Sequence, residues 1–103
     1  MARQALFIQH RTLPGAREDV ARVWRKHMEP AISGNPGHEA YFYCFGGDPD
    51  AICAFQMYSN PEAAAEFLRS PSYASYNEEV TSLLLGEPTV TVLEVQWSKG
   101  TPE

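Results

Sequence analysis

The sequence predicts an α+β fold in which a four-stranded antiparallel sheet carries its helices on one face. Two apolar runs joined by a short polar hinge predict a hairpin in the middle of the chain, and amphipathic segments on either side predict helices. The resulting order is β-α-β-β-α-β, the split β-α-β arrangement of ferredoxin-like folds. A chain of 103 residues has the length of one domain, for which we expect a core at about 5–98 and a loose tail at 99–103.

The strands are marked by apolar and β-branched runs between turn residues. A first strand is expected at Leu6–Thr12, where Leu13-Pro14-Gly15 ends it, and a fourth at Thr89–Trp97. The hairpin consists of YFYCF (41–45) and AICAFQMY (51–58) around the hinge GGDPD. Neither of its runs alternates cleanly between apolar and polar residues, so both faces of these strands are apolar.

Two helical units are expected, one before the hairpin and one after it. Apolar residues recur every three or four positions from about Ala16 to Glu29, the spacing of one helical face, and Pro30 should kink or end this helix. Asn60-Pro61 and Ser70-Pro71 each combine a good N-cap with a proline at the first helical position. They therefore open two further helices, of which the second extends to about Leu85 and stops before a glycine.

The apolar character of both strand faces raises the question of what covers the sheet. Helices in this fold cover only one of its faces. A bare apolar face of this size exceeds the patches that soluble monomers usually tolerate. We therefore expect a homodimer in which two sheets pack face to face, and the alternative is a monomer with an apolar surface.

Composition excludes several classes of partner. A net charge of −5 argues against a nucleic-acid surface, because phosphate binding needs clustered lysine and arginine. No apolar stretch approaches the ~20 residues that cross a bilayer, and the N-terminus lacks the long apolar core of a signal peptide. We expect a cytoplasmic protein without membrane contact. Histidine, cysteine and aspartate show no metal-ligand spacing, so no metal site is expected.

The two cysteines are expected to be free. If the hairpin is symmetric about Asp48-Pro49, Cys44 lies opposite Cys53, as Phe42 lies opposite Phe55. Directly opposed residues have Cβ atoms ~4.5–5.5 Å apart, whereas a disulfide favours ~3.8 Å. A bridge there would be strained and easily reduced, so we expect two largely buried thiols that behave as small apolar residues.

Several segments together resemble the antibiotic biosynthesis monooxygenase domain, a dimeric α/β-barrel family that includes quinol monooxygenases. They are RTLPG after the first strand, NPGHEAYFY before the second, DPDAICAFQMYSNPEAAAEFL through the third, and SPSYASYNEEVTSLLLG in the last helix. The likeness covers nearly everything from Leu6 to Trp97. It implies a monooxygenase that needs no metal or cofactor, abstracts a proton from a phenol-like substrate and lets the resulting carbanion meet dioxygen.

Some positions depart from the family's usual functional residues. The resemblance places Ala54 and Tyr58 where anthrone-type members carry Asn and Trp. Asn77 stands where heme-degrading relatives have a histidine that binds iron, which argues against heme. Phe67 and Ser72 match positions where quinol-type members often have histidines. The resemblance therefore implies the fold more firmly than the activity.

Three residues are candidates for catalysis: His10, Tyr58 and Asn77. On strand alternation, His10 shares a face with Leu6 and Ile8. An imidazole that titrates near neutrality could act as a general base, with Tyr58 and Asn77 positioning the substrate. The alternative is a structural histidine at the sheet edge or dimer interface.

A flat aromatic ligand could lie between the last helix and the sheet, where the resemblance implies a cavity. The candidate substrate-binding residues bring aromatic rings, hydroxyls and an amide to this region; they are Tyr41, Tyr43, Gln56, Phe67 and Tyr73. The tyrosines could equally be interface residues. His38 follows a loop glycine and is expected to be exposed.

Three functions remain open. The first is a cofactor-independent monooxygenase acting on a small phenol, quinol or anthrone-like molecule. The second is a non-catalytic small-ligand-binding or stress-response protein that uses the same pocket. The third, ranked last, is a heme-degrading monooxygenase. The expected partners are a second copy of the chain and a small aromatic ligand, whose identity the sequence does not specify.

Overall fold

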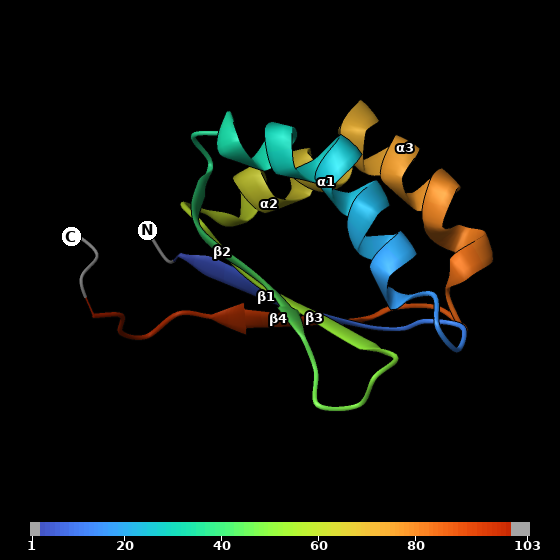
Figure 1. Cartoon of the computed structure of the whole chain (residues 1–103). Coiled ribbons are helices and arrows are strands. Elements are labelled where there is room, and N and C mark those ends of the chain that lie inside the picture. The colour runs from blue at the N-terminus through green and yellow to red at the C-terminus, as the bar shows by residue number, and fades with distance from the viewer. Residues whose placement is uncertain (1–2, 100–103) are drawn as a thin grey trace.

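Four antiparallel strands form one sheet in the order β2-β3-β1-β4, and all the helices lie against one of its faces (Figure 1). The computed structural model describes residues 3–99. Its elements are β1 (Gln4–Arg11), α1 (Arg17–Ser33), β2 (His38–Phe45), β3 (Ala51–Tyr58), α2 (Pro61–Leu68), α3 (Pro71–Val80), a 3-10 turn η1 (Thr81–Leu83) and β4 (Thr89–Glu94). The predicted ferredoxin-like α+β fold is confirmed. The loose tail expected at 99–103 lies, apart from Lys99, outside the described residues.

The predicted helix starts are confirmed by their caps. The side chain of Asn60 accepts a hydrogen bond from the Ala63 amide at 2.8 Å, and that of Ser70 accepts one from the Tyr73 amide at 3.3 Å. In both helices a proline fills the first position, where no amide hydrogen is needed. Gly86 adopts φ 80° after the last helical turn, a conformation that glycine reaches without strain.

Three predicted element ends are wrong, the first for a local reason and the other two because of contacts with β1. α1 continues through Pro30 to Ser33, because this proline lies in the last turn and its carbonyl still accepts from the Gly34 amide. α3 ends at Val80 rather than near Leu85, whose amide instead donates to Arg11 O of β1 at 2.7 Å. β4 stops at Glu94 because its partner there, Gln4, is the first residue of β1, so β1 has no further residue for β4 to pair with.

The core between the sheet and the helices is apolar and closely packed. Leu6 of β1, Ile52 of β3 and Val20 of α1 are each at most 1% exposed, and Val80 of α3 joins them. Burying side chains of this kind is the main stabilising contribution in a domain of this size. This core holds the inner face of the sheet against α1 and α3.

A register shift near the start of β2 changes which face His38 occupies. His38 pairs with Tyr58, Ala40 with Met57 and Tyr41 with Gln56, so one extra residue is accommodated between His38 and Ala40. Directly paired residues point to the same face, so His38 joins Tyr41 on the helix side. The expectation that His38 is exposed is wrong: it is half-buried under α2.

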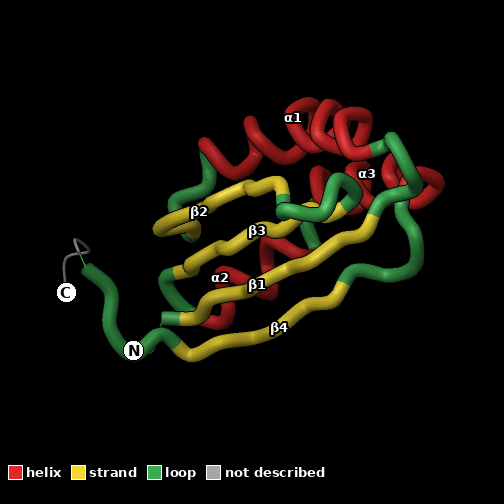
Figure 2. Tube along the Cα trace, turned by 60° about the horizontal axis from the view of Figure 1, so that its bottom comes forward, coloured by secondary structure: helices red, strands yellow, loops and turns green. Residues whose placement is uncertain are grey.

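Within residues 3–99, no helix covers the opposite face of the sheet, as the view from that side shows (Figure 2). Phe42 is 59% exposed there and Leu93 40%, with Phe7 and Phe55 of the inner strands partly exposed between them. We refer to this surface, formed by Phe7, Phe42, Cys44, Cys53, Phe55 and Leu93, as the bare face. The helices also stop short of β4, so Val92 is 63% exposed on the helix side.

The hairpin register is confirmed, since Cys44 pairs with Cys53 and Phe42 with Phe55. Both cysteines are free, but the single chain does not bury them as expected: Cys44 is exposed and Cys53 partly exposed, because both lie on the bare face. We expect two titratable thiols per chain when protein purified without reductant is unfolded, because opposed strand residues do not meet disulfide geometry without strain. Finding no thiol, with a mass lower by the two lost hydrogen atoms, would contradict this.

Candidate functional site

All five tyrosines of the chain gather between the sheet and the helices. They are Tyr41 and Tyr43 from β2, Tyr58 from β3, and Tyr73 and Tyr76 from α3. We call this set the tyrosine cluster. The strand tyrosines point inward because they alternate with residues of the bare face, and the α3 pair lies on the helical stripe that faces the sheet.

The hydroxyls of the cluster are only partly satisfied within the protein. Trp24 of α1 stacks on Tyr43 with ring centroids 4.1 Å apart, and its Nε1 donates to the Tyr41 hydroxyl at 3.3 Å. The hydroxyl of Tyr58 donates to Gln56 Oε1 at 2.5 Å. The hydroxyl of Tyr43 is buried and has no hydrogen-bond partner among residues 3–99. It is a free polar group in an aromatic interior.

Burial keeps these phenols neutral. It raises the pKa of Tyr41 to about 12, and it also raises the pKa values of Tyr43, Tyr58 and Tyr76. Neighbouring tyrosines raise the pKa values of Tyr43, Tyr58 and Tyr76 further, because two phenolates close together would repel each other. These four tyrosines therefore carry O–H groups rather than phenolates at neutral pH.

His10 lies at one end of the cluster, on the predicted face of β1. Its ring meets Tyr76 edge-on with centroids 6.5 Å apart. Its Nδ1 is buried and, within the described chain, unpaired. Burial lowers the pKa of His10, so the imidazole stays neutral near pH 7 and can accept a proton.

His38 lies at the other end of the cluster and was missed by sequence reasoning. Its ring packs on Tyr58 with centroids 4.4 Å apart and meets Phe67 of α2 at right angles at 4.6 Å. Burial lowers the pKa of His38, and the Gln56 side chain partly offsets this, although that contact falls short of a hydrogen bond in the structure. Gly37 is a sequence signal that the segment before β2 passes close to α2, because a Cβ at this position would lie only 3.0 Å from Ala63.

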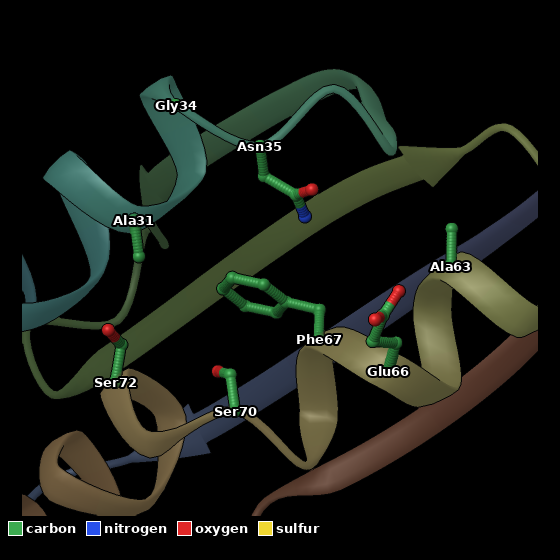
Figure 3. A pocket seen from close by; sticks show the side chains of 8 residues that line it. All are labelled: Ala31, Gly34, Asn35, Ala63, Glu66, Phe67, Ser70 and Ser72. Carbon is green, nitrogen blue, oxygen red and sulfur yellow. The ribbon is translucent and has the colours of Figure 1, made fainter.

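A pocket of about 310 Å³ opens where the end of α1, α2 and the start of α3 meet (Figure 3). Phe67 projects into its middle and Asn35 points toward it from the segment after α1. The remaining lining comes from Ala31, Gly34, Ala63, Glu66, Ser70 and Ser72. Since Phe67 also contacts His38 and lies 6.3 Å from Tyr73, its ring separates this pocket from the tyrosine cluster.

The predicted site residues fall into one interior group and a rim. Tyr41, Tyr43, Gln56, Tyr58, Phe67 and Tyr73 are neighbours in the interior. Asn77 instead lines a hollow of about 260 Å³ against the segment that leads to β4, and His10 lines another of about 240 Å³; Glu87 borders both. Within residues 3–99, no three histidine, cysteine or acidic side chains converge to hold a metal.

Similar solved structures share the fold. A protein of unknown function from Nitrosomonas europaea is 20% identical with a TM-score of 0.85, and covers 100% of this chain and 98% of that one. Rv0793 from Mycobacterium tuberculosis is 23% identical with a TM-score of 0.82 (96% and 99%). An antibiotic biosynthesis monooxygenase is 15% identical with a TM-score of 0.81 (90% and 98%). At these identities the likeness shows the fold alone.

A family model provides the assignment that these structures do not. No curated protein matches the chain. None of the helices in the described part has both the length and the apolarity to span a bilayer. The model of the antibiotic biosynthesis monooxygenase family matches residues 4–79, from β1 through nearly all of α3. The chain belongs to the antibiotic biosynthesis monooxygenase family.

Proposed function

We propose that this protein is a monooxygenase that oxidises a small phenol, quinol or anthrone-like substrate without a metal or organic cofactor. Family membership supports the reaction class. The observation that carries the proposal is the buried juxtaposition of a neutral imidazole, His10, with the neutral phenol of Tyr76 at the end of the tyrosine cluster. Proton abstraction from a phenol needs such a base, and the anion that forms needs hydrogen-bond donors.

In this mechanism His10 takes a proton from the substrate, and the resulting carbanion reacts with dioxygen. One oxygen atom of dioxygen replaces two hydrogen atoms of the substrate, and the product is a ketone or quinone. The other oxygen leaves as water with those two hydrogens, so the substrate supplies all the electrons. Tyr58 and Asn77 position the substrate, and the remaining interior residues, Tyr41, Tyr43, Gln56, Phe67 and Tyr73, line its site.

We expect oxygen uptake with hydroquinones or anthrones that survives dialysis against a chelator. His10→Ala should lower kcat by roughly 10²–10⁴-fold, the usual contribution of a general base. The rate should rise with pH through the lowered pKa of His10, because the base must be unprotonated. His27→Ala, which removes an imidazole at the α1–α3 surface beside Glu79, is the matched control. Full activity in His10→Ala would remove it from the mechanism, and loss on chelation would refute the cofactor-free reaction.

The alternative is a protein that binds the same class of ligand without oxidising it. It is favoured by Ala54, which is 3% exposed on the inner face of β3 and carries no polar group, and by Tyr58, which is fully buried and already bonded to Gln56. Saturable ligand binding without oxygen uptake would establish it. Heme degradation is disfavoured because Asn77, on α3, offers no imidazole to iron.

We also propose that the protein is a cytoplasmic homodimer whose two bare faces pack together. The support is the apolar content of that face, where Phe42 and Leu93 are well exposed next to Phe7 and Phe55. Sheets that pack in this way interdigitate the side chains of their inner faces, which would remove these rings from water. Free, opposed cysteines suit a reducing compartment.

A further inference from the structure

We propose that His38 binds the substrate, by donating a hydrogen bond from Nε2 to an oxygen atom on the aromatic ring. This assignment rests on the proposed function, since it names a contact of that same site. The register shift in β2 brings His38 to the inner face, directly opposite Tyr58. Its ring is enclosed by aromatic neighbours, with Tyr41 at 5.7 Å completing the contacts to Tyr58 and Phe67.

The loop before β2 fixes the orientation of the Asn35 amide. The Gly37 amide donates to Asn35 Oδ1 at 3.1 Å, so this oxygen is the acceptor. Asn35 Nδ2 then lies 2.9 Å from His38 Nδ1. The His38 amide also donates to the Asn35 carbonyl at 3.2 Å, and the Ser59 amide donates to the Gly37 carbonyl at 3.0 Å, so the loop is anchored at both ends.

This orientation selects one tautomer of His38. Because Asn35 Nδ2 can only donate, Nδ1 of the imidazole must accept, and the proton of the neutral ring is on Nε2. Protonating Nδ1 as well would set two N–H groups against each other. The imidazole is therefore a donor at Nε2 and is held in that state by its neighbours.

The Nε2–H of His38 is buried without a hydrogen-bond partner among the described residues. Leaving such a group unsatisfied costs about 1–3 kcal/mol. A ligand oxygen would satisfy it, and the aromatic rings around His38 provide a surface for a flat ligand. The adjacent pocket has about 310 Å³, the lower end of the size typical for small ligands, and Phe67 lies between it and His38.

A first test reads the tautomer by ¹⁵N NMR of the imidazole, independently of activity. We expect the Nε2–H form of His38 at neutral pH. In Asn35→Asp a carboxylate replaces the amide donor, so the proton should move to Nδ1 or the ring should become protonated. An Nδ1–H tautomer in the unmodified protein would overturn the assignment.

A second test compares binding of 2-naphthol with that of naphthalene, which lacks the oxygen. The protein should bind 2-naphthol more tightly than naphthalene. His38→Phe should lower the affinity for 2-naphthol about tenfold, the value of one hydrogen bond, and leave the affinity for naphthalene undiminished. His38→Gln, which retains an N–H donor, should recover part of the loss. His27→Phe, at the α1–α3 surface beside Glu79, controls for the ring exchange.

The outcomes separate this proposal from the catalytic one. Unchanged discrimination between the two ligands in His38→Phe, or no binding of 2-naphthol to the unmodified protein, would overturn the role of His38. Discrimination that is lost in His38→Phe, in a protein that consumes no oxygen, would support the role of His38 and contradict the oxygenase proposal alone.

Discussion

Replacing Phe42 with glutamate is expected to make the protein monomeric at micromolar concentration. Phe42 is 59% exposed in the single chain and stands on the bare face opposite Phe55. In a two-fold dimer each substitution would place two carboxylates in an apolar interface, where an unpaired charge is costly. We expect the dimer dissociation constant to rise by at least ~100-fold, which corresponds to about 2.8 kcal/mol. Analytical ultracentrifugation would measure it.

Leu85→Glu is the matched control for this experiment. Leu85 is 55% exposed, almost as much as Phe42, but it lies between η1 and β4 and not on the bare face. It should leave assembly unchanged. A monomeric unmodified protein, or an undiminished dimer in Phe42→Glu, would show that the bare face is not the interface.

The second large effect is expected from Leu6→Ala. Leu6 is 1% exposed and sits in the core on the inner face of β1, between Gln56 and Val92 of the neighbouring strands. Truncating a buried leucine leaves a cavity and costs about 2–5 kcal/mol of unfolding free energy. Denaturant unfolding at one fixed protein concentration would measure it, since dimer stability depends on concentration.

A leucine on the surface provides the comparison. Leu85→Ala removes the same atoms from a side chain that is 55% exposed, so its effect should stay within about 0.5 kcal/mol. Equal losses for the two variants would show that the packing around Leu6 in the structure is not that of the protein in solution.

Local sequence signals predicted the parts of the fold that local chemistry determines. The hinge between the hairpin strands is short, so the pairing of Cys44 with Cys53 followed from counting. Asn60 and Ser70 cap helices through contacts three residues away. The end of α3 could not be predicted in this way, because it depends on a bond from Leu85 to β1.

The candidate site was predictable to the same degree. Strand alternation correctly placed His10 on the same face as Leu6 and Ile8, since β1 and β3 pair without interruption. His38 was expected to be exposed because it follows a loop glycine, but β2 already begins at His38, and the extra residue between His38 and Ala40 turns its side chain inward. No propensity distinguishes that insertion in a strand this rich in aromatic residues, and the result was a missed imidazole in the interior.

The position of β4 has a consequence for how this protein behaves when crowded. Its sequence, TVTVLE, is rich in β-branched residues, has no proline and carries a single charge. All six residues are exposed and the strand is the last in the sheet, so its outer backbone groups have no neighbouring strand in the described part of the chain (Figure 2). Such an edge is a template for adding strands from other molecules into fibrils. Packing two bare faces together would leave this edge open. Glu94 and the repulsion between chains of net charge −5 would then be what opposes aggregation at this edge.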